Sequence, residues 1–265
     1  MTLTVSVLGV PYDEQSSFLA GCAAGPTSIR NAFRSAASNT FCESGIDVGD
    51  HERIRDAGDI NPGSGQAARE KIETTIADLV AQGHRVLSLG GDHSISWPIL
   101  RGYSQQYPQL NVLHLDAHPD LYDELDGNRF SHATPMARAL EDGLIRRLAQ
   151  VGIRTMNRHQ QEQADRFGVE VIPMNQWHRE MRFEFDGPVY LTLDLDVLDP
   201  AFAPGISHYE PGGMSTREVI SIIQGLDVDL VGADIVELNP SRDINGVTAT
   251  VAAKFMKEIL AKLAS

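Results

Sequence analysis

Short apolar runs alternate with amphipathic segments along the whole chain. The runs are rich in leucine and β-branched residues, which is typical of buried strands, and they lie at 3–9, 53–56, 85–89, 111–115, 149–153, 169–172, 188–193 and 229–235. The segments between them carry apolar residues at helical spacing, at 26–37, 65–82, 94–106, 135–148, 159–167, 216–225 and 247–263. This alternation predicts an α/β fold in three layers, with a central, mostly parallel sheet of about eight strands flanked by helices.

The length of the chain fits one large domain, covering residues 1–265, because a chain of this size can bury a substantial core. No linker, low-complexity tract or internal repeat interrupts the pattern. Three long irregular segments remain, at 38–52, 119–133 and 199–215, and such loops in a compact domain are commonly functional. We expect the second and third to form walls of a binding pocket, and the first to be a solvated surface loop.

Composition and charge narrow the classes of function. The formal net charge of −14 argues against nucleic acid or an anionic membrane surface as partner and is compatible with a cationic substrate. No apolar stretch approaches the roughly 20 residues that span a bilayer. Cys22 and Cys42 have neither metal-ligand spacing nor a disulfide framework, and the first residues lack the features of a signal peptide. We therefore expect a cytoplasmic location.

Three short polar segments follow predicted strands, at 90–93, 116–120 and 194–196. Open α/β sheets place their ligand crevice at the carboxyl ends of the strands, where all three segments would meet. Residues two apart on an extended chain point to the same side, so each of the last two segments can direct a pair of side chains at one point. The candidate ligands are His93, Asp116, His118, Asp120, Asp194 and Asp196.

Four carboxylates and two imidazoles suit a pair of hard-to-borderline divalent ions better than zinc held by thiolates. The ionised carboxylates carry about −4, which balances two divalent ions that bridging carboxylates hold roughly 3.5–4 Å apart. Each segment alone is commonly a capping turn or a strand end, but their occurrence after separate strands favours a two-metal hydrolytic centre. His114 lies inside a strand, and we expect it to be a hydrogen-bonded core histidine.

With these segments in view, the chain resembles the ureohydrolase family, which includes arginases and agmatinases. The shared motifs include Gly-Pro-x-x-Ile-Arg at 25–30, Gly-Gly-Asp-His-Ser at 90–94, Asp-Ala-His-Pro-Asp at 116–120, Asp-Leu-Asp-Val-Leu-Asp-Pro at 194–200 and Asp-Ile-Val-Glu-Leu-Asn-Pro at 234–240. The resemblance runs nearly end to end. It implies an arginase-like fold, two Mn²⁺ ions per chain, and a homo-oligomer that is a trimer or a hexamer.

The resemblance also implies roles for particular residues. One ion would be held by His93, Asp116, Asp120 and Asp194, and the other by Asp116, His118, Asp194 and Asp196, with Asp116 and Asp194 as bridges. His132 matches the family's proton-shuttling histidine, and its ordinary pKa suits that role. Glu237 matches the carboxylate that orients the planar guanidinium. Without the resemblance, an exposed loop histidine and a strand-end ion pair would be the preferred interpretations.

The motifs are most similar to those of plant-type arginases. Animal-type arginases hold the amino-acid end of arginine with an asparagine at a position that Tyr122 occupies here. The candidates for contacts with the substrate's tail are therefore Tyr122, Asn157, Ser207 and His208.

The resemblance implies that a metal-bridging hydroxide cleaves a guanidino C–N bond, with L-arginine giving L-ornithine and urea. The alternative is the hydrolysis of agmatine to putrescine and urea, or of another small guanidino compound. A dimetal phosphohydrolase is disfavoured, because no glycine-rich phosphate cradle adjoins the ligand segments. A non-catalytic relative would be expected to lose ligands, and all six are present.

Overall fold

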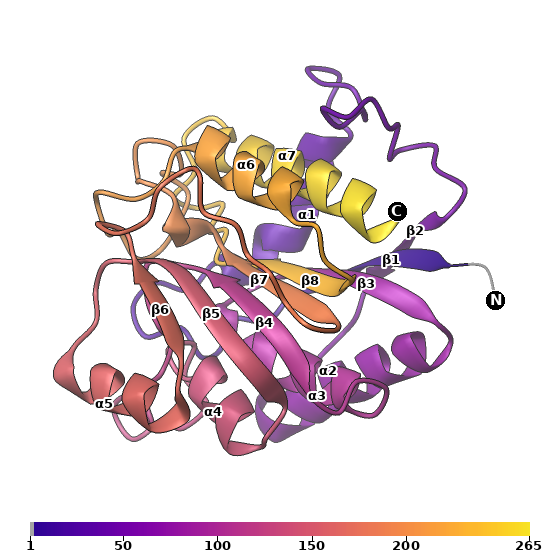
Figure 1. Ribbon diagram of the computed structural model, residues 1–265. Helices are drawn as coiled ribbons and strands as arrows, with labels where there is room; N and C mark the ends of the chain where they lie inside the picture. The colour runs from indigo at the N-terminus through magenta and orange to yellow at the C-terminus, as the bar shows by residue number, and fades with distance from the viewer. Residues whose placement is uncertain (1–2) are drawn as a thin grey trace.

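Eight parallel strands form one sheet through the middle of the protein (Figure 1). A computed structural model describes residues 3–265. The strands are β1 (Thr4–Val10), β2 (Ile54–Asp59), β3 (His84–Gly90), β4 (Leu110–Leu115), β5 (Ile145–Ile153), β6 (Glu170–Pro173), β7 (Val189–Asp194) and β8 (Leu230–Val236). Their order is β2-β1-β3-β8-β7-β4-β5-β6, and every neighbouring pair is parallel. The predicted α/β architecture is confirmed.

Helices cover both faces of the sheet and complete the three layers (Figure 1). One face carries α1 (Gly25–Phe33), α6 (Thr216–Gly225) and α7 (Val247–Leu263). The other carries α2 (Gly65–Ala81), α3 (Ser96–Ser104), α4 (Pro135–Glu141) and α5 (Arg158–Phe167). Within residues 3–265, no helix has the length and apolar character that crossing a membrane requires.

Side chains that alternate along a strand enter two separate apolar cores. Leu87 and Leu89 of β3 join the core beneath α6 and α7, whereas Val86 joins the core beneath α2 and α3. Because both faces are covered, β4, β7 and β8 are buried at every position. This double burial explains why their sequences are almost continuously apolar.

Three predicted boundaries are wrong by at least four residues. Helix α4 ends at Glu141 and not at 148, and β5 begins at Ile145 and not at 149. Gly143, at φ +68°, provides the left-handed residue that ends a helix at little steric cost. The chain then pairs Ile145 with Leu110 of β4. Helix α1 also ends early, at Phe33 and not at 37.

The strand order places the polar segments together. Strands β3 and β4 are consecutive along the chain but are separated in the sheet by β8 and β7. Such a change in strand order opens a crevice at the carboxyl ends of the strands. The segments that follow these four central strands are 91–94, 116–120, 195–197 and 237–240.

Candidate metal centre and substrate cavity

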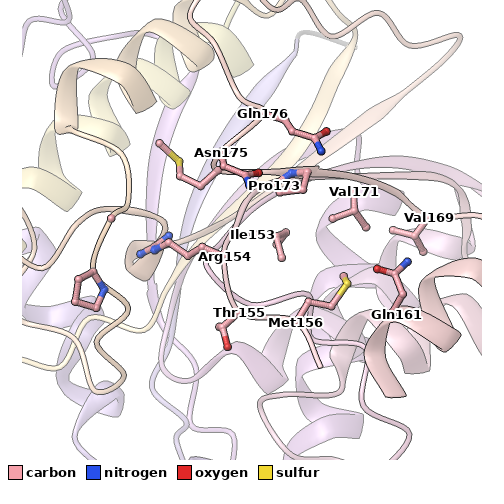
Figure 2. Close-up of a pocket in the computed structure, with 13 residues that line it drawn as sticks. Ile153, Arg154, Thr155, Met156, Gln161, Val169, Val171, Pro173, Asn175 and Gln176 are labelled. Carbon is pink, nitrogen blue, oxygen red and sulfur yellow. The ribbon is translucent and has the colours of Figure 1, made fainter. Parts of the chain in front are cut away.

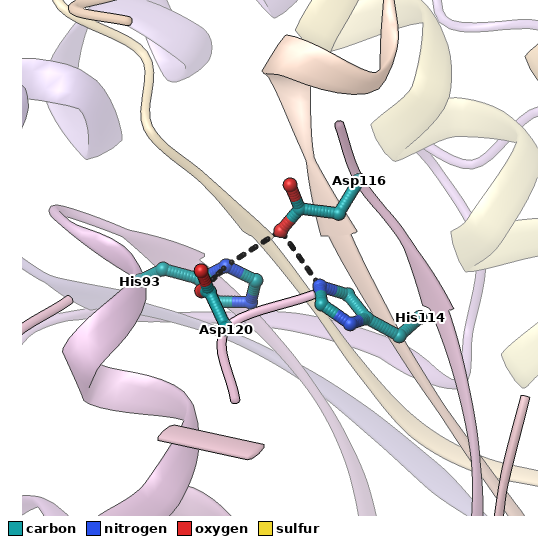
Figure 3. Close-up of side chains that lie close together, drawn as sticks. All are labelled: His93, His114, Asp116 and Asp120. Carbon is teal, nitrogen blue, oxygen red and sulfur yellow. Dashed lines mark hydrogen bonds and ion pairs between the residues drawn. The ribbon is translucent and has the colours of Figure 1, made fainter. Parts of the chain in front are cut away.

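The ring of His93 enters a cluster of carboxylates at the end of β3. Its Nδ1 lies 3.1 Å from Asp116 Oδ2, 3.0 Å from Asp120 Oδ2 and 3.3 Å from Asp194 Oδ2. Figure 3 shows His93, Asp116 and Asp120 directed toward one another. All four side chains are buried. Three of the predicted carboxylate ligands thus surround one ring nitrogen of His93, which is itself a predicted ligand.

The other ring nitrogen of His93 defines the position of the ring proton. Nε2 lies 2.8 Å from Thr192 Oγ1, and that hydroxyl donates to Asp234 Oδ1 at 2.7 Å. Because the hydroxyl proton is used, Thr192 accepts a hydrogen bond from Nε2–H. The neutral ring therefore presents the Nδ1 lone pair to three carboxylates, and this atom has no hydrogen-bond partner among residues 3–265.

A lone pair facing anionic oxygens is unfavourable unless a cation lies between them. In the metal-free protein, burial opposes charge on His93, but the three carboxylates outweigh burial and raise its pKa well above the ordinary value. A proton then takes the place of the cation. The donor set and the orphaned Nδ1 atom both fit a divalent ion.

A second group of ligands shares Asp116. His118 Nδ1 lies 2.8 Å from Asp196 Oδ2 and 3.5 Å from Asp116 Oδ1, while the other oxygen of Asp116 faces His93. Three side chains of this group, Asp116, His118 and Asp196, place ligand atoms within 4.8 Å of one another. Asp116 thus faces both groups, as a bridging carboxylate would. Asp194 faces His93 in this structure, and its role as a second bridge stays a prediction.

His114 supports Asp116 from within β4 (Figure 3). Its Nδ1 accepts a hydrogen bond of 3.0 Å from Gln150 Nε2, so its Nε2–H donates to Asp116 Oδ2 at 2.7 Å. The ring is fully buried and both of its nitrogens have partners. His114 is therefore a hydrogen-bonded core histidine, as we expected, although its ring also lies within 4.8 Å of ligand atoms of His93, Asp116 and Asp120.

The carboxylates are too crowded to ionise freely in the absence of a cation. Burial raises the pKa of Asp194 well above the ordinary value, and the charges of Asp196 and Asp116 add to this effect. Burial and Asp116 likewise raise the pKa of Asp196 to about 6. Burial also opposes ionisation of Asp116, but the neighbouring histidines, His114 first and then His118 and His93, together lower its pKa well below the ordinary value. Bound divalent ions would relieve the repulsion between these carboxylates, because the positive charge of an ion in a metal centre favours ionised ligands.

A cavity of about 160 Å³ opens above the clustered carboxylates. Its lining includes the predicted residues His118, Asp120, Asp194, Asp196, Tyr122, His132, His208 and Glu237. Ser17 and Gln160 also line it and were missed from the sequence. Asn157 and Ser207 are not among the lining residues, so their assignment as direct contacts stays a prediction.

Glu237 and His132 form an ion pair in the cavity wall. Glu237 Oε1 lies 3.2 Å from His132 Nδ1 and accepts a hydrogen bond of 2.8 Å from the backbone N–H of His93. Burial opposes both charges, but each partner outweighs it for the other. The pKa of His132 is raised to about 9 and that of Glu237 is lowered to about 2. Both residues are therefore charged at neutral pH.

The backbone of Glu237 adopts a conformation that is rare for this residue type. Its φ is +67°, in the left-handed region, and its N–H donates to Gly91 O at 2.9 Å. Non-glycine residues in this region are strained and cluster at functional sites. The buried Cys22 thiol, 3.4 Å from Oε2, contacts the second carboxylate oxygen.

A loop between β1 and α1 closes one side of the cavity. Ser17 Oγ lies 2.9 Å from His132 Nε2 and 3.4 Å from His208 Nε2. Asp92 anchors this loop, because its Oδ2 accepts a hydrogen bond of 2.9 Å from Gln15 N. Ser17 could not be found from the sequence, since only the fold brings residues 17 and 132 together.

The predicted tail contacts have different surroundings. Tyr122 lines the cavity, and its hydroxyl accepts a hydrogen bond of 2.7 Å from Asn157 Nδ2. Asn157 caps the first turn of α5. The hydroxyl of Ser207 donates to Leu19 O at 3.0 Å and accepts from Asn239 Nδ2 at 2.9 Å. The side chains of Asn157 and Ser207 are thus committed to protein partners.

A larger hollow of about 850 Å³ lies beside β6, at the edge of the sheet (Figure 2). Its walls include Ile153 and Val171, and none of the predicted site residues lines it. The guanidinium of Arg154 in its wall donates to Asp196 O and Glu210 O, both at 2.6 Å. This hollow lacks the charged cluster of the smaller cavity, which is therefore the better candidate for the active site.

Comparisons with known proteins agree with the motifs. A model of the Arginase family matches residues 3–261. Arginase 1, mitochondrial, of Arabidopsis thaliana is 43% identical over 98% of this chain and 81% of its own length. Agmatinase of Neisseria meningitidis is 36% identical over 96% of this chain and 85% of its own. The solved arginase of Medicago truncatula has a TM-score of 0.92 at 39% identity, covering 99% of this chain and 88% of that one.

The expectation of a cytoplasmic location is wrong on this comparison. The plant arginases to which the chain is similar are named as mitochondrial or chloroplastic proteins. The expectation depended partly on unpaired cysteines, and Cys22 and Cys42 are indeed free and buried. Free thiols indicate a reducing environment but do not separate one reducing compartment from another.

Proposed function

The chain belongs to the arginase family, and from this premise we propose that it is a Mn²⁺-dependent enzyme that hydrolyses L-arginine to L-ornithine and urea. One observation carries the proposal. The Nδ1 lone pair of His93 faces three buried carboxylates at the floor of a cavity whose wall holds the His132–Glu237 pair. A cation site and a charged pair that suits a guanidinium therefore share one small cavity.

Two Mn²⁺ ions would be held by the two ligand groups described above, His93, Asp116, Asp120 and Asp194 on one side and Asp116, His118, Asp194 and Asp196 on the other. When bound, they supply hydroxide at neutral pH, because divalent ions lower the pKa of water. Thr192 and His114 keep the ligand side chains of His93 and Asp116 in orientation. Such outer contacts commonly change metal affinity 10- to 100-fold.

Glu237 binds and orients the guanidinium. Its Oε1 is fixed by the backbone N–H of His93, and its carboxylate stays ionised at neutral pH. A planar guanidinium pairs well with a carboxylate, since its N–H groups form a fixed fork of donors. This pairing holds the guanidinium carbon over the cluster of carboxylates.

His132 provides a proton to the departing amine. Attack of hydroxide on the guanidinium carbon gives a tetrahedral species, and the C–N bond to the amino-acid side chain then breaks. The leaving nitrogen must take a proton, because a free amide anion is a poor leaving group. His132 lines the cavity beside Glu237, which raises the pKa of the imidazole to about 9 in the metal-free protein. General acid catalysis of this kind contributes about 10²- to 10⁴-fold.

The choice of arginine over agmatine depends on the substrate's tail, since both compounds carry the same guanidinium. The plant arginases among the relatives favour arginine, whereas the agmatinase relative and Tyr122 keep agmatine as the alternative. The net charge of −14 attracts the more positive agmatine at long range, but salt screens this attraction over about 10 Å. Local contacts therefore decide.

The decisive experiment measures urea release by the purified, Mn²⁺-loaded protein with a panel of guanidino compounds. We expect a higher kcat/KM for L-arginine than for agmatine at physiological ionic strength. A ratio in favour of agmatine would support the alternative function. Light scattering of the same preparation tests the trimer or hexamer that the resemblance implies.

A further inference from the structure

The hydroxyl of Ser17 lies between two histidine rings in the cavity wall, and we propose that it holds the ring of His132 in position for proton donation. Ser17 Oγ lies 2.9 Å from His132 Nε2 and 3.4 Å from His208 Nε2. Ser17 and His208 are thus assigned as positioning residues that act through His132. This inference rests on the proposed function and adds two residues to those that serve the departing amine.

The ring of His132 has a hydrogen-bond partner on each side. Its Nδ1 lies 3.2 Å from Glu237 Oε1, and an ionised carboxylate only accepts, so this nitrogen carries a hydrogen. A general acid holds its proton before the transfer, so Nε2 then carries a hydrogen as well. The side chain is only 12% exposed, and a buried cationic N–H group is costly to leave without an acceptor. Ser17 Oγ is the acceptor that Nε2–H requires.

The protons of the three side chains can be assigned in one direction. A hydroxyl has a single proton to donate, so two ring nitrogens that face it cannot both accept from it. When Ser17 accepts from His132 Nε2–H, its own proton donates to His208 Nε2. The centroids of the two rings are 4.8 Å apart, and like charges at this distance repel, which favours a neutral His208 beside a charged His132. Each donor in the chain then has an acceptor.

The loop that carries Ser17 is joined to the loop that carries His132. The backbone N–H of His132 donates to Gln15 O at 3.1 Å, and Asn128 Nδ2 donates to Gln15 Oε1 at 2.8 Å. On its other side, the N–H of Gln15 donates to Asp92 Oδ2 at 2.9 Å. These bonds fix the backbone two residues before Ser17. The hydroxyl is therefore held beside His132 before any substrate enters the cavity.

The kinetic test is Ser17→Ala, which removes only the hydroxyl. With the Mn²⁺-loaded protein and its best guanidino substrate, we expect kcat to fall about 3- to 30-fold, since the lost bond is to a charged group but water replaces it in part. KM and the content of two ions should be kept, because Glu237 and the metal ligands have no hydrogen bond with Ser17 among residues 3–265. Ser17→Thr keeps a hydroxyl and should retain more of kcat than Ser17→Ala does.

Ser16→Ala is the matched control on the same loop. It removes the neighbouring hydroxyl, which lies 3.5 Å from Asp92 Oδ2 and has no hydrogen bond with a histidine in the described part of the chain. Its kcat should equal that of the wild type. The comparison separates a contact with His132 from a general effect on the loop.

A second measurement observes the hydrogen bond without turnover. In the metal-free, full-length protein at neutral pH, the Nε2–H proton of His132 should give a proton NMR signal that is protected from exchange with water. The loss of this signal in His132→Asn identifies it. Ser17→Ala should lose the protection, whereas Ser16→Ala should keep it.

The inference is overturned if Ser17→Ala keeps the protected signal, or lowers kcat no more than Ser16→Ala does. It is also overturned if Ser17→Ala loses bound metal, since Ser17 would then support the loop as a whole. Urea release by the wild-type protein would in each case still support the proposed function. If no guanidino compound yields urea with the metal-loaded wild type, the proposed function fails, whereas the NMR comparison still decides whether Ser17 holds the ring.

Discussion

The aspartates at the carboxyl ends of the strands should differ in the number of ions that each one binds. Because six side chains cannot fill the shells of two ions without sharing, we expect about two Mn²⁺ per chain, with Asp116 and Asp194 as bridges. Asp194→Ala should weaken both ions, whereas Asp120→Ala and His93→Ala should chiefly release one. Metal analysis of the purified variants measures this. Full occupancy by two ions in Asp194→Ala would contradict the bridging role.

His132 should act on protons and not on metal. It pairs with Glu237 at 3.2 Å and lies outside the two ligand groups at the strand ends, although its ring also forms a cluster with His208 and Glu237 whose ligand atoms lie within 4.8 Å of one another. His132→Ala should therefore keep both ions and lose on the order of 10²- to 10⁴-fold in kcat. Metal analysis serves as the control for the kinetic measurement. Turnover at the wild-type rate would remove His132 from the mechanism.

The candidate ligands could be predicted from the sequence because two of the three segments supply two or three of them close together. Their supporting residues could not. Thr192 and Asp234 each look like an isolated polar residue in an apolar strand, and only the pairing of β7 with β8 brings them together next to His93. A buried polar residue in a central strand was the available signal, because such a group must have a partner.

A substitution in the turn that follows β3 tests how closely this turn packs against the loop that follows β1. A Cβ on Gly91 would lie 1.8 Å from the carbonyl oxygen of Tyr12, which also accepts a hydrogen bond from Asp92 N. Gly91→Ala should therefore displace the turn that leads to His93, lowering the free energy of unfolding by at least about 1–3 kcal/mol and weakening metal binding.

Gly225 provides the matched control for this substitution. It is the last residue of α6, and a Cβ there would meet no atom within 4 Å. Gly225→Ala should leave stability unchanged or raise it slightly, because alanine favours the helix. Chemical denaturation compares the two variants. Equal stabilities would show that the turn can relax around the added methyl group.

Helices and strands were predictable where their apolar period was long and clear. The predicted and observed bounds coincide for α6 and α7 and differ by one residue for β7. The prediction was wrong between α4 and β5, where 135–148 read as one helix. The left-handed turn at Gly143 and the pairing of Ile145 with β4 decide the boundary there, and the pairing is a property of the sheet and not of the local sequence.

The stability of the whole protein should depend on pH through the His132–Glu237 pair. Pairing raises the pKa of His132 from 6.5 to about 9 in the metal-free protein. This stabilisation is fully present below pH 6.5 and is lost as the pH rises through about 9. For Glu237, whose pKa is lowered from 4.5 to about 2, it is present above pH 4.5 and lost toward 2.

Urea denaturation with a chelator present at pH 6.5 and 9.5 measures the loss, which should be on the order of 1–3 kcal/mol. The variant His132→Asn lacks this titration but keeps the other histidines, so it should lose less over the same interval. Equal losses in the two proteins would show that the pair contributes nothing to stability.

The position of β8 has a consequence for how the protein is made. The last strand of the chain lies between β3 and β7, in the middle of the sheet. While residues 230–236 are still inside a ribosome, the emerged chain has two unjoined groups of strands, β2-β1-β3 and β7-β4-β5-β6, each with an open edge. His93 is on one group and Asp116 and Asp194 are on the other. Insertion of β8 joins them, so the ligand group around His93 is assembled only after β8 has emerged.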